Sequence, residues 1–101
     1  MAITSTVSAD NSSLVINIEG RFDFSCHQDF RRAYESVSAK PEAYVVDMNN
    51  TAYLDSSALG MLLLLRDYAG GDNANISIVN CNEDVKKILS ISNFEQLFTI
   101  K

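Results

Sequence analysis

The residues with the clearest chemical potential are two adjacent serines, Ser56 and Ser57, which follow Asp55 and precede a strongly apolar segment. Side-chain oxygens of Asp and Ser at the start of a helix accept hydrogen bonds from the unpaired N–H groups of its first turn. A serine hydroxyl there also lies at the positive end of the helix dipole, where an added phosphate is tolerated. The pattern therefore predicts either a simple helix cap or a phosphorylation switch, and taken alone it favours the cap.

A serine nucleophile for hydrolysis would need a base and an oxyanion hole. The chain has a single histidine, His27, and no G-x-S-x-G nucleophile elbow, so a hydrolase is disfavoured. Cys26 and Cys81 are far apart and belong to no motif with metal-ligand spacing, which favours two reduced thiols over a disulfide. We therefore expect a protein that is not an enzyme and that needs no cofactor and no metal.

Length and charge narrow the class of function. The 101 residues predict a single domain over 1–101, and the net charge of −5 with only isolated basic pairs argues against a nucleic-acid surface. The N-terminus lacks a secretory signal, and the apolar run near 58–65 is too short to span a bilayer. We expect a cytoplasmic protein that binds neither nucleic acid nor membrane.

Two strands are predicted in the first twenty residues. Residues 3–7 are expected to form a weak strand, and 9–12 have turn composition. Leu14, Ile16 and Ile18 then alternate with Val15, Asn17 and Glu19, which is the period of two that is typical of a strand. The two strands are expected to pair as an antiparallel hairpin, although the length of the connection fixes the register poorly.

A helix and a central strand come next. Ser25 and Gln28 have capping-box spacing, which predicts a helix from Ser25 that ends before Pro41. The run Tyr44–Met48 is almost continuously apolar, as in a central strand covered on both faces. A strand, a helix and another strand imply a right-handed crossover and parallel pairing.

A second helix is predicted from Ser56 or Ser57 to Ala69, and it ends at two glycines. One stripe of the helix is expected to join the core, and three further leucines make the apolar face unusually wide. We favour a helix buried between the sheet and a neighbouring helix, with a partner-docking surface as the alternative. Gly60 weakens the helix interior, which close approach of another backbone would explain. The core stripe consists of Ala58, Met61, Leu62 and Leu65, and the further leucines are Leu59, Leu63 and Leu64.

The last third of the chain predicts a strand over 76–79 and a third helix capped by Asn82. Asn93 resembles a helix stop because asparagine tolerates the left-handed conformation. A short helical turn and an extended end over 99–100 follow. The expected fold is α/β, with a small mixed β-sheet and helices packed against it, in the order β-β-α-β-α-β-α plus a short final strand.

Three motifs resemble the bacterial anti-sigma factor antagonists, the single-domain form of the STAS fold. They are YLDSSALG (Tyr53 to Gly60), GRFD (Gly20 to Asp23) and VKKILSISNFEQLFTI (Val85 to Ile100). The first motif is specific in its context between a strand and an apolar helix, and the other two support it. The resemblance covers essentially the whole chain, so it implies a single STAS domain.

The resemblance implies a partner switch. Ser56 would be phosphorylated by an anti-sigma factor that is itself a serine kinase of the HATPase type, and a PP2C-type phosphatase would reverse this. The unphosphorylated form would bind the anti-sigma factor and release its client. Asp23, Asp55, Ser57 and Leu59 would form the partner-binding site around Ser56, with Ser57 supporting the helix start.

Two residues depart from the family pattern. Arg21 stands where relatives often carry an acidic residue, which changes the charge beside the site, and Ala58 stands where many carry glycine. Both departures leave the Ser56 hydroxyl in place. An alternative within the same family is a STAS subunit of a transport or lipid-trafficking ATPase complex.

Overall fold

The computed structural model describes residues 2–8, 10, 12–37 and 41–101, with the side chain of residue 2 left out. The predicted order of elements is confirmed: the described residues form a five-stranded sheet and three helices. Short 3-10 turns follow β2, α2 and α3. The elements are β1 (Ala2–Val7), β2 (Ser13–Phe22), α1 (His27–Glu35), β3 (Ala43–Leu54), α2 (Ser56–Tyr68), β4 (Ile76–Val79), α3 (Glu83–Ile91) and β5 (Thr99–Ile100).

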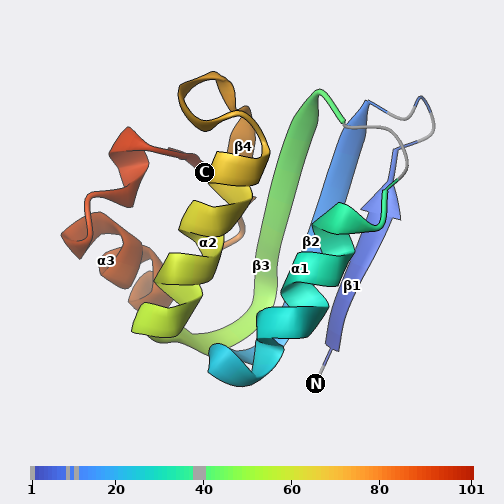
Figure 1. Ribbon diagram of the computed structural model, residues 1–101. Helices are drawn as coiled ribbons and strands as arrows, with labels where there is room; N and C mark the ends of the chain where they lie inside the picture. Colours follow the sequence, from blue (N-terminus) through green and yellow to red (C-terminus); the bar gives the residue numbers. More distant parts are fainter. Residues whose placement is uncertain (1, 9, 11, 38–40) are drawn as a thin grey trace.

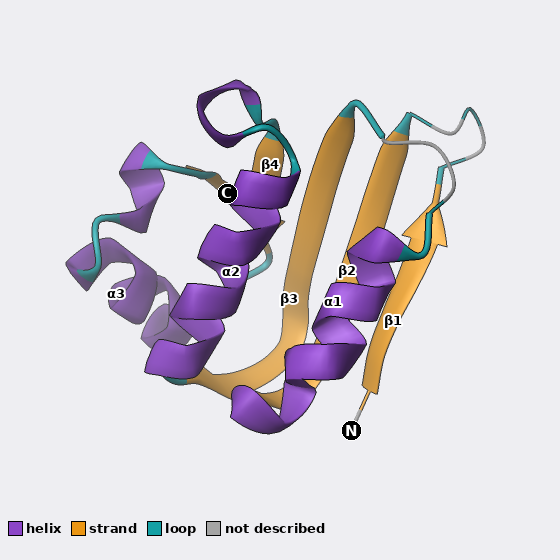
Figure 2. Ribbon diagram, in the orientation of Figure 1, coloured by secondary structure: helices purple, strands orange, loops and turns teal. Residues whose placement is uncertain are grey.

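The sheet is mixed and has the strand order β1-β2-β3-β4-β5. β1 runs antiparallel to β2, as the predicted hairpin requires, and the other neighbours are parallel. Right-handed crossovers that all step in one direction place their helices on one face of a sheet. Figure 1 and Figure 2 show this arrangement: α1 and α2 lie in front of the sheet, on the face turned toward the viewer, and α3 lies beside α2.

The core lies between that face and the helices. Alternate residues of β2, of the first half of β3 and of β4 are buried in register, so that Ile16 pairs with Val46 and Val46 pairs with Ile78, each with no exposed surface. Their neighbours Val45 and Asp47 are half-buried, because they point to the other face. The expectation that the central strand is covered on both faces is therefore wrong: the helices of the described residues lie on one face of the sheet.

β3 is much longer than the predicted Tyr44–Met48, because it continues through the polar residues that precede Asp55. Two register shifts let this extension pair with the end of β2. Thr51 is 2% exposed there, and its hydroxyl donates to the carbonyl of Ile18 over 2.8 Å. That bond satisfies the buried hydroxyl, which is why a polar stretch that looks like a loop is a strand.

The first helix does not begin at Ser25. Asp23 precedes a 3-10 turn over Phe24–Cys26, and its Oδ1 accepts from the Ser25 backbone N–H at 3.0 Å. The Ser25 hydroxyl donates to the same carboxylate at 2.5 Å, so it serves Asp23 and does not cap the helix itself. α1 follows from His27.

The other ends of helices agree with the sequence. The Asn82 side chain accepts from the Val85 N–H at 2.8 Å and caps α3, and Asn93 is left-handed with φ 60°. α2 ends at Tyr68, before Gly70 with φ 121°. Cys26 and Cys81 are free thiols, as expected.

Two further expectations concern the hairpin turn and the membrane. In the predicted turn 9–12, residues 9 and 11 lie outside the described residues, while Asp10 accepts from the hydroxyls of Ser8 and Ser12. Those bonds lower the pKa of the Asp10 carboxyl to about 2. In the described part of the chain, the helices are too short or too polar to cross a bilayer.

Candidate docking site around Ser56

Two acidic residues meet at one edge of the sheet. β2 and β3 are parallel neighbours, so their carboxyl ends lie at the same edge, where loops commonly carry function. The backbone N–H of Asp55 donates to the carbonyl of Phe22 over 3.4 Å. This bond joins the start of α2 to the connection that carries Asp23, next to the end of β3 in Figure 1.

Asp55 is the cap of α2. Its backbone is extended, with φ −114°, and its Oδ1 accepts from the Ala58 N–H at 3.0 Å. Its carbonyl accepts from the Leu59 N–H at 3.2 Å, the first bond of the helix. Ser56 and Ser57 are therefore the first two residues of α2, and neither supplies the capping oxygen.

We expect Asp55→Ala to lower the free energy of unfolding by about 0.5–2 kcal/mol, because the Ala58 N–H loses its acceptor. Ser57→Ala is the matched control and is expected to change that energy by less than about 0.5 kcal/mol. Urea denaturation of the three proteins measures both values. A larger loss in Ser57→Ala than in Asp55→Ala would return the capping role to Ser57.

The Ser56 hydroxyl is accessible. Ser56 is exposed, whereas Ser57 is half-buried, and Ser56 Oγ forms no hydrogen bond with any described residue. The site therefore presents a free hydroxyl at the first position of a 13-residue helix. Such a position tolerates an added phosphate within the domain, since the helix dipole contributes about 0.3–1 kcal/mol in its favour.

Charge around the hydroxyl is mixed. Hydrogen bonds from the hydroxyl and backbone N–H of Ser25 hold the pKa of Asp23 below its usual value, so Asp23 is an anion at neutral pH. Arg21 Nε lies 3.5 Å from Asp23 Oδ2, and its guanidinium lies over the ring of Tyr53 at 4.8 Å. Arg21 therefore offsets part of the acidic charge at this edge. Sequence reasoning missed this contact, which depends on the register of β2 against β3.

Exposed apolar side chains lie along α2 and on the segments that precede α1 and α2. Helical spacing places Gly60, Leu63 and Leu64 on the outward side of α2 that begins with Ser56. Leu63 is 42% exposed and Leu64 53% exposed, so the favoured expectation that these leucines are buried is wrong. Phe24 and Tyr53 are also exposed, at 70% and 42%. Leu59 is half-buried and packs against the core.

Gly60 leaves this side of α2 flat. A Cβ added at Gly60 would have no heavy atom within 4 Å, so the close backbone approach considered from the sequence is wrong. Because residue 60 has no side chain, the surface between Ser56 and the two exposed leucines is open to solvent. Contiguous exposed apolar groups, unlike single ones, mark interaction sites, and Leu63 and Leu64 are neighbouring exposed leucines on this side.

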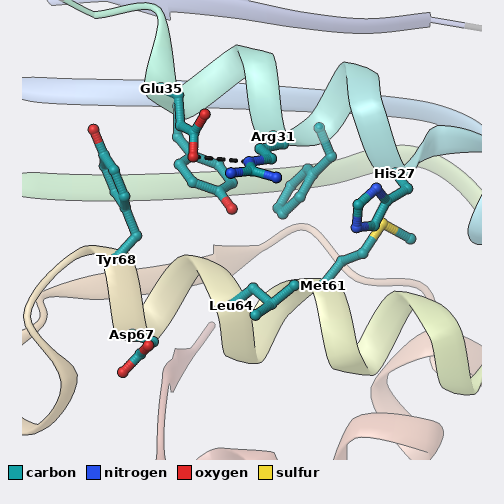
Figure 3. A pocket seen from close by; sticks show the side chains of 9 residues that line it. His27, Arg31, Glu35, Met61, Leu64, Asp67 and Tyr68 are labelled. Atoms are coloured by element: carbon teal, nitrogen blue, oxygen red, sulfur yellow. Dashed lines mark hydrogen bonds and ion pairs between the residues drawn. The ribbon is translucent and has the colours of Figure 1, made fainter.

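A groove of about 280 Å³ lies beside this surface, between α1 and α2. Figure 3 shows Met61 and Leu64 of α2 on one side of the groove and Arg31 and Glu35 of α1 on the other. Arg31 and Glu35 form an ion pair with each other at 2.9 Å. His27 lines one end and stacks on Phe24, with ring centroids 5.6 Å apart. Leu64 belongs both to the groove and to the outward side of α2, so the two surfaces are continuous.

Comparison with known proteins identifies the family of this chain and a close relative. Residues 5–99 match the family model described as "Mlab, STAS domain". A STAS-domain containing protein of Pseudomonas aeruginosa (strain UCBPP-PA14) is 67% identical over 100 residues, which cover 99% of this chain and 99% of that protein.

Several solved structures share the fold. An anti-sigma factor antagonist from Mycobacterium paratuberculosis is 19% identical, with a TM-score of 0.79, over 98% of this chain and 85% of that chain. The phosphorylated form of the Bacillus cell fate determinant SpoIIAA is 14% identical, with a TM-score of 0.64, over 99% and 91% of the chains. A sulfate transporter family protein from Wolinella succinogenes is 12% identical, with a TM-score of 0.75, over 93% and 80%.

Proposed function

This chain belongs to the STAS domain family, and we propose that it is the binding component of a phosphorylation-controlled partner switch. One observation carries the proposal: an exposed, unbonded Ser56 hydroxyl begins α2 next to exposed apolar side chains. In this role the unphosphorylated protein docks on an anti-sigma factor or a comparable regulator, which then releases its client. Phosphate on Ser56 blocks docking, and its removal restores it.

The physical basis of the switch is a change of charge at a contact surface. Phosphorylation adds about −1.5 to −2 charges, close to Asp23 and Asp55, on a chain whose net charge is −5. In solvent the fold tolerates this charge, but in a closed interface an unpaired dianion loses its hydration at a cost of several kcal/mol. About 2.7 kcal/mol is enough for a hundredfold loss of affinity. The switch therefore needs no large conformational change.

The enzymes that this switch requires are part of the proposal. The partner is an anti-sigma factor with a HATPase-type serine kinase activity, and a PP2C-type serine phosphatase removes the phosphate. Support comes from the motif YLDSSALG and from structures of the same fold described as anti-sigma factor antagonists and as a phosphorylated form. The docking surface comprises Ser56 with Asp23 and Asp55, the exposed Leu63 and Leu64, and the groove between α1 and α2.

A second candidate is a STAS subunit of a transport or lipid-trafficking ATPase complex. The similarity to a sulfate transporter family protein favours it, because the same fold is found in a transport family. The same surface would then dock on an ATPase or a membrane component. Recovery of a membrane-bound complex by Ser56→Ala protein would support this candidate, whereas recovery of a kinase would support the first.

We expect intact-mass analysis of the protein purified from its native cell to detect a species heavier by one phosphate, located on Ser56 by peptide mapping. Treatment with a serine phosphatase should remove it. The Ser57→Ala variant should retain the modification and the Ser56→Ala variant should lose it. Phosphate that persists in Ser56→Ala, or that maps to Ser57, would contradict the assignment.

A further inference from the structure

Among the residues that the structure describes, the outer edge of β1 has none of the features that protect exposed strands. Proteins usually shield an edge with charged side chains, proline, a bulge or a very short strand. β1 has the sequence AITSTV, which contains no charge and no proline, and six consecutive pairs join it to β2 in an unbroken register. β5, at the opposite edge, is only two residues long and is followed by Lys101. One edge of this sheet is thus protected and the other is open.

The register shows which backbone groups of β1 face outward. Ser8, just after β1, donates its N–H to the carbonyl of Ser13 over 2.8 Å, so Ser8 faces β2. Alternate residues of an antiparallel strand face the same side, so the N–H and C=O groups of Ile3, Ser5 and Val7 point away from β2. No described residue pairs with that side, since β1 is the last strand of the sheet.

We propose that β1 pairs with β1 of a second copy of this chain, antiparallel and centred on Ser5. A two-fold axis at Ser5 opposes Ser5 to itself, Ile3 to Val7, and Thr4 to Thr6. The first two pairs exchange backbone hydrogen bonds and lie on the helix-covered face, while the threonines pair on the other face. Each side chain thus meets one of similar polarity, which is the self-complementarity that a two-fold dimer needs.

Charge favours a second copy as the occupant of this edge. A chain with a net charge of −5 repels itself wherever like charges face each other, and β1 offers an uncharged strip that avoids this. α1 packs over β1 and β2, and its side away from the α1–α2 groove carries the Asp29–Arg32 ion pair at 3.6 Å. Because Asp29 and Arg32 carry opposite charges, that side of α1 adds no net charge near the two-fold axis.

The dimer would be weak and would carry two docking sites. Strand pairing alone falls below the size of a standard interface, so we expect a dissociation constant on the order of 10 µM. Ala2 pairs with Glu19 near the Ser56 end of the sheet, so a two-fold axis at Ser5 places the two Ser56 sites at opposite ends. The ten-stranded sheet would present both to a dimeric or clustered partner, with a gain in avidity.

Sedimentation velocity at protein concentrations from about 1 to 100 µM, which span the expected constant, tests the proposal on the protein itself. The wild type should shift from monomer to dimer over this range. Ser5→Lys should weaken dimerisation at least tenfold by placing two cations on the axis, and Ser5→Pro should do the same by removing an outward N–H. Thr99→Lys on β5 is the matched control and should dimerise as the wild type does.

Amide hydrogen exchange adds a measurement at residue level. The Ile3, Ser5 and Val7 amides should become protected as the concentration rises, and Ser5→Lys should abolish this without changing the exchange of β3 amides. A wild type that stays monomeric at about 100 µM overturns the proposal. The β1 edge would then be available only for pairing with a strand of another protein. A dimer that persists in both Ser5 variants also overturns it.

Discussion

Replacing Ser56 with aspartate is expected to weaken binding of the partner about hundredfold, whereas Ser56→Ala binds as the unphosphorylated protein does. The Ser56→Asp substitution would place a carboxylate beside Asp23 and Asp55 in the contact, where desolvation and like-charge repulsion oppose docking. A hundredfold loss corresponds to about 2.7 kcal/mol. The Ser56→Ala substitution adds no charge and removes a hydroxyl that bonds to no described residue, so the fold and the surface remain.

The partner is first identified as the protein that Ser56→Ala recovers from the native cell. The purified partner is then titrated with each variant, and the dissociation constants are compared. Ser90→Asp is the matched control, because Ser90 is an exposed serine on α3 and its substitution adds the same charge elsewhere. Ser90→Asp should bind within about twofold of the wild type, as distant surface substitutions have small effects. Equal affinities of Ser56→Ala and Ser56→Asp would contradict the charge mechanism.

Leu64→Asp is expected to weaken binding by a similar factor whatever the state of Ser56. Leu64 lies eight residues after Ser56 on α2, about 12 Å along the helix, and is 53% exposed at the lip of the groove. A large apolar side chain at the centre of an interface contributes about 2 kcal/mol or more when it is buried on binding. A carboxylate there would be desolvated without a partner.

Ile91→Asp is the control for this substitution. Ile91 is 72% exposed on α3, so the change is chemically matched but lies on a different helix. Both variants should retain the free energy of unfolding of the wild type within about 0.5 kcal/mol, since neither residue is buried. If Leu64→Asp and Ile91→Asp bind the partner equally well, the outward side of α2 is not part of the docking surface.

The buried half of the molecule could be predicted from the sequence because burial leaves a periodic pattern. Leu14, Ile16 and Ile18 alternate along β2, and all three are at most 1% exposed. Helical spacing likewise identified the stripe of α2 that packs on the sheet, including Leu62 and Leu65, both fully buried. Periodicity works here because it is a direct consequence of strand and helix geometry.

The ends of helices were harder to predict because neighbouring oxygens compete for the same N–H groups. An aspartate precedes a serine both at the 3-10 turn before α1 and at the start of α2, and in each case the carboxylate accepts the bond. Ser25 and Ser57 have the composition of caps, but Asp23 and Asp55 occupy that role. A carboxylate is the stronger acceptor, since hydrogen bonds to charged groups are stronger than neutral ones.

The sequence left open whether the extra leucines of α2 are buried or exposed, since this depends on tertiary arrangement. Leu63 and Leu64 look like core residues, yet α2 packs on the sheet with its other side, and no described element covers these two leucines fully. The contact of Arg21 with Tyr53 depends on the register shifts between β2 and β3, which no local pattern encodes. Apolar residues in excess of one packing face are thus a useful signal for a docking surface.

The most direct test compares the affinity of one partner for the unphosphorylated protein and for protein that carries a single phosphate on Ser56. Isothermal titration of both forms gives the two dissociation constants under one set of conditions. The switch predicts a loss of at least about a hundredfold on phosphorylation, with an unchanged fold by circular dichroism. Affinities within about threefold of each other, a difference of less than about 1 kcal/mol, would contradict it.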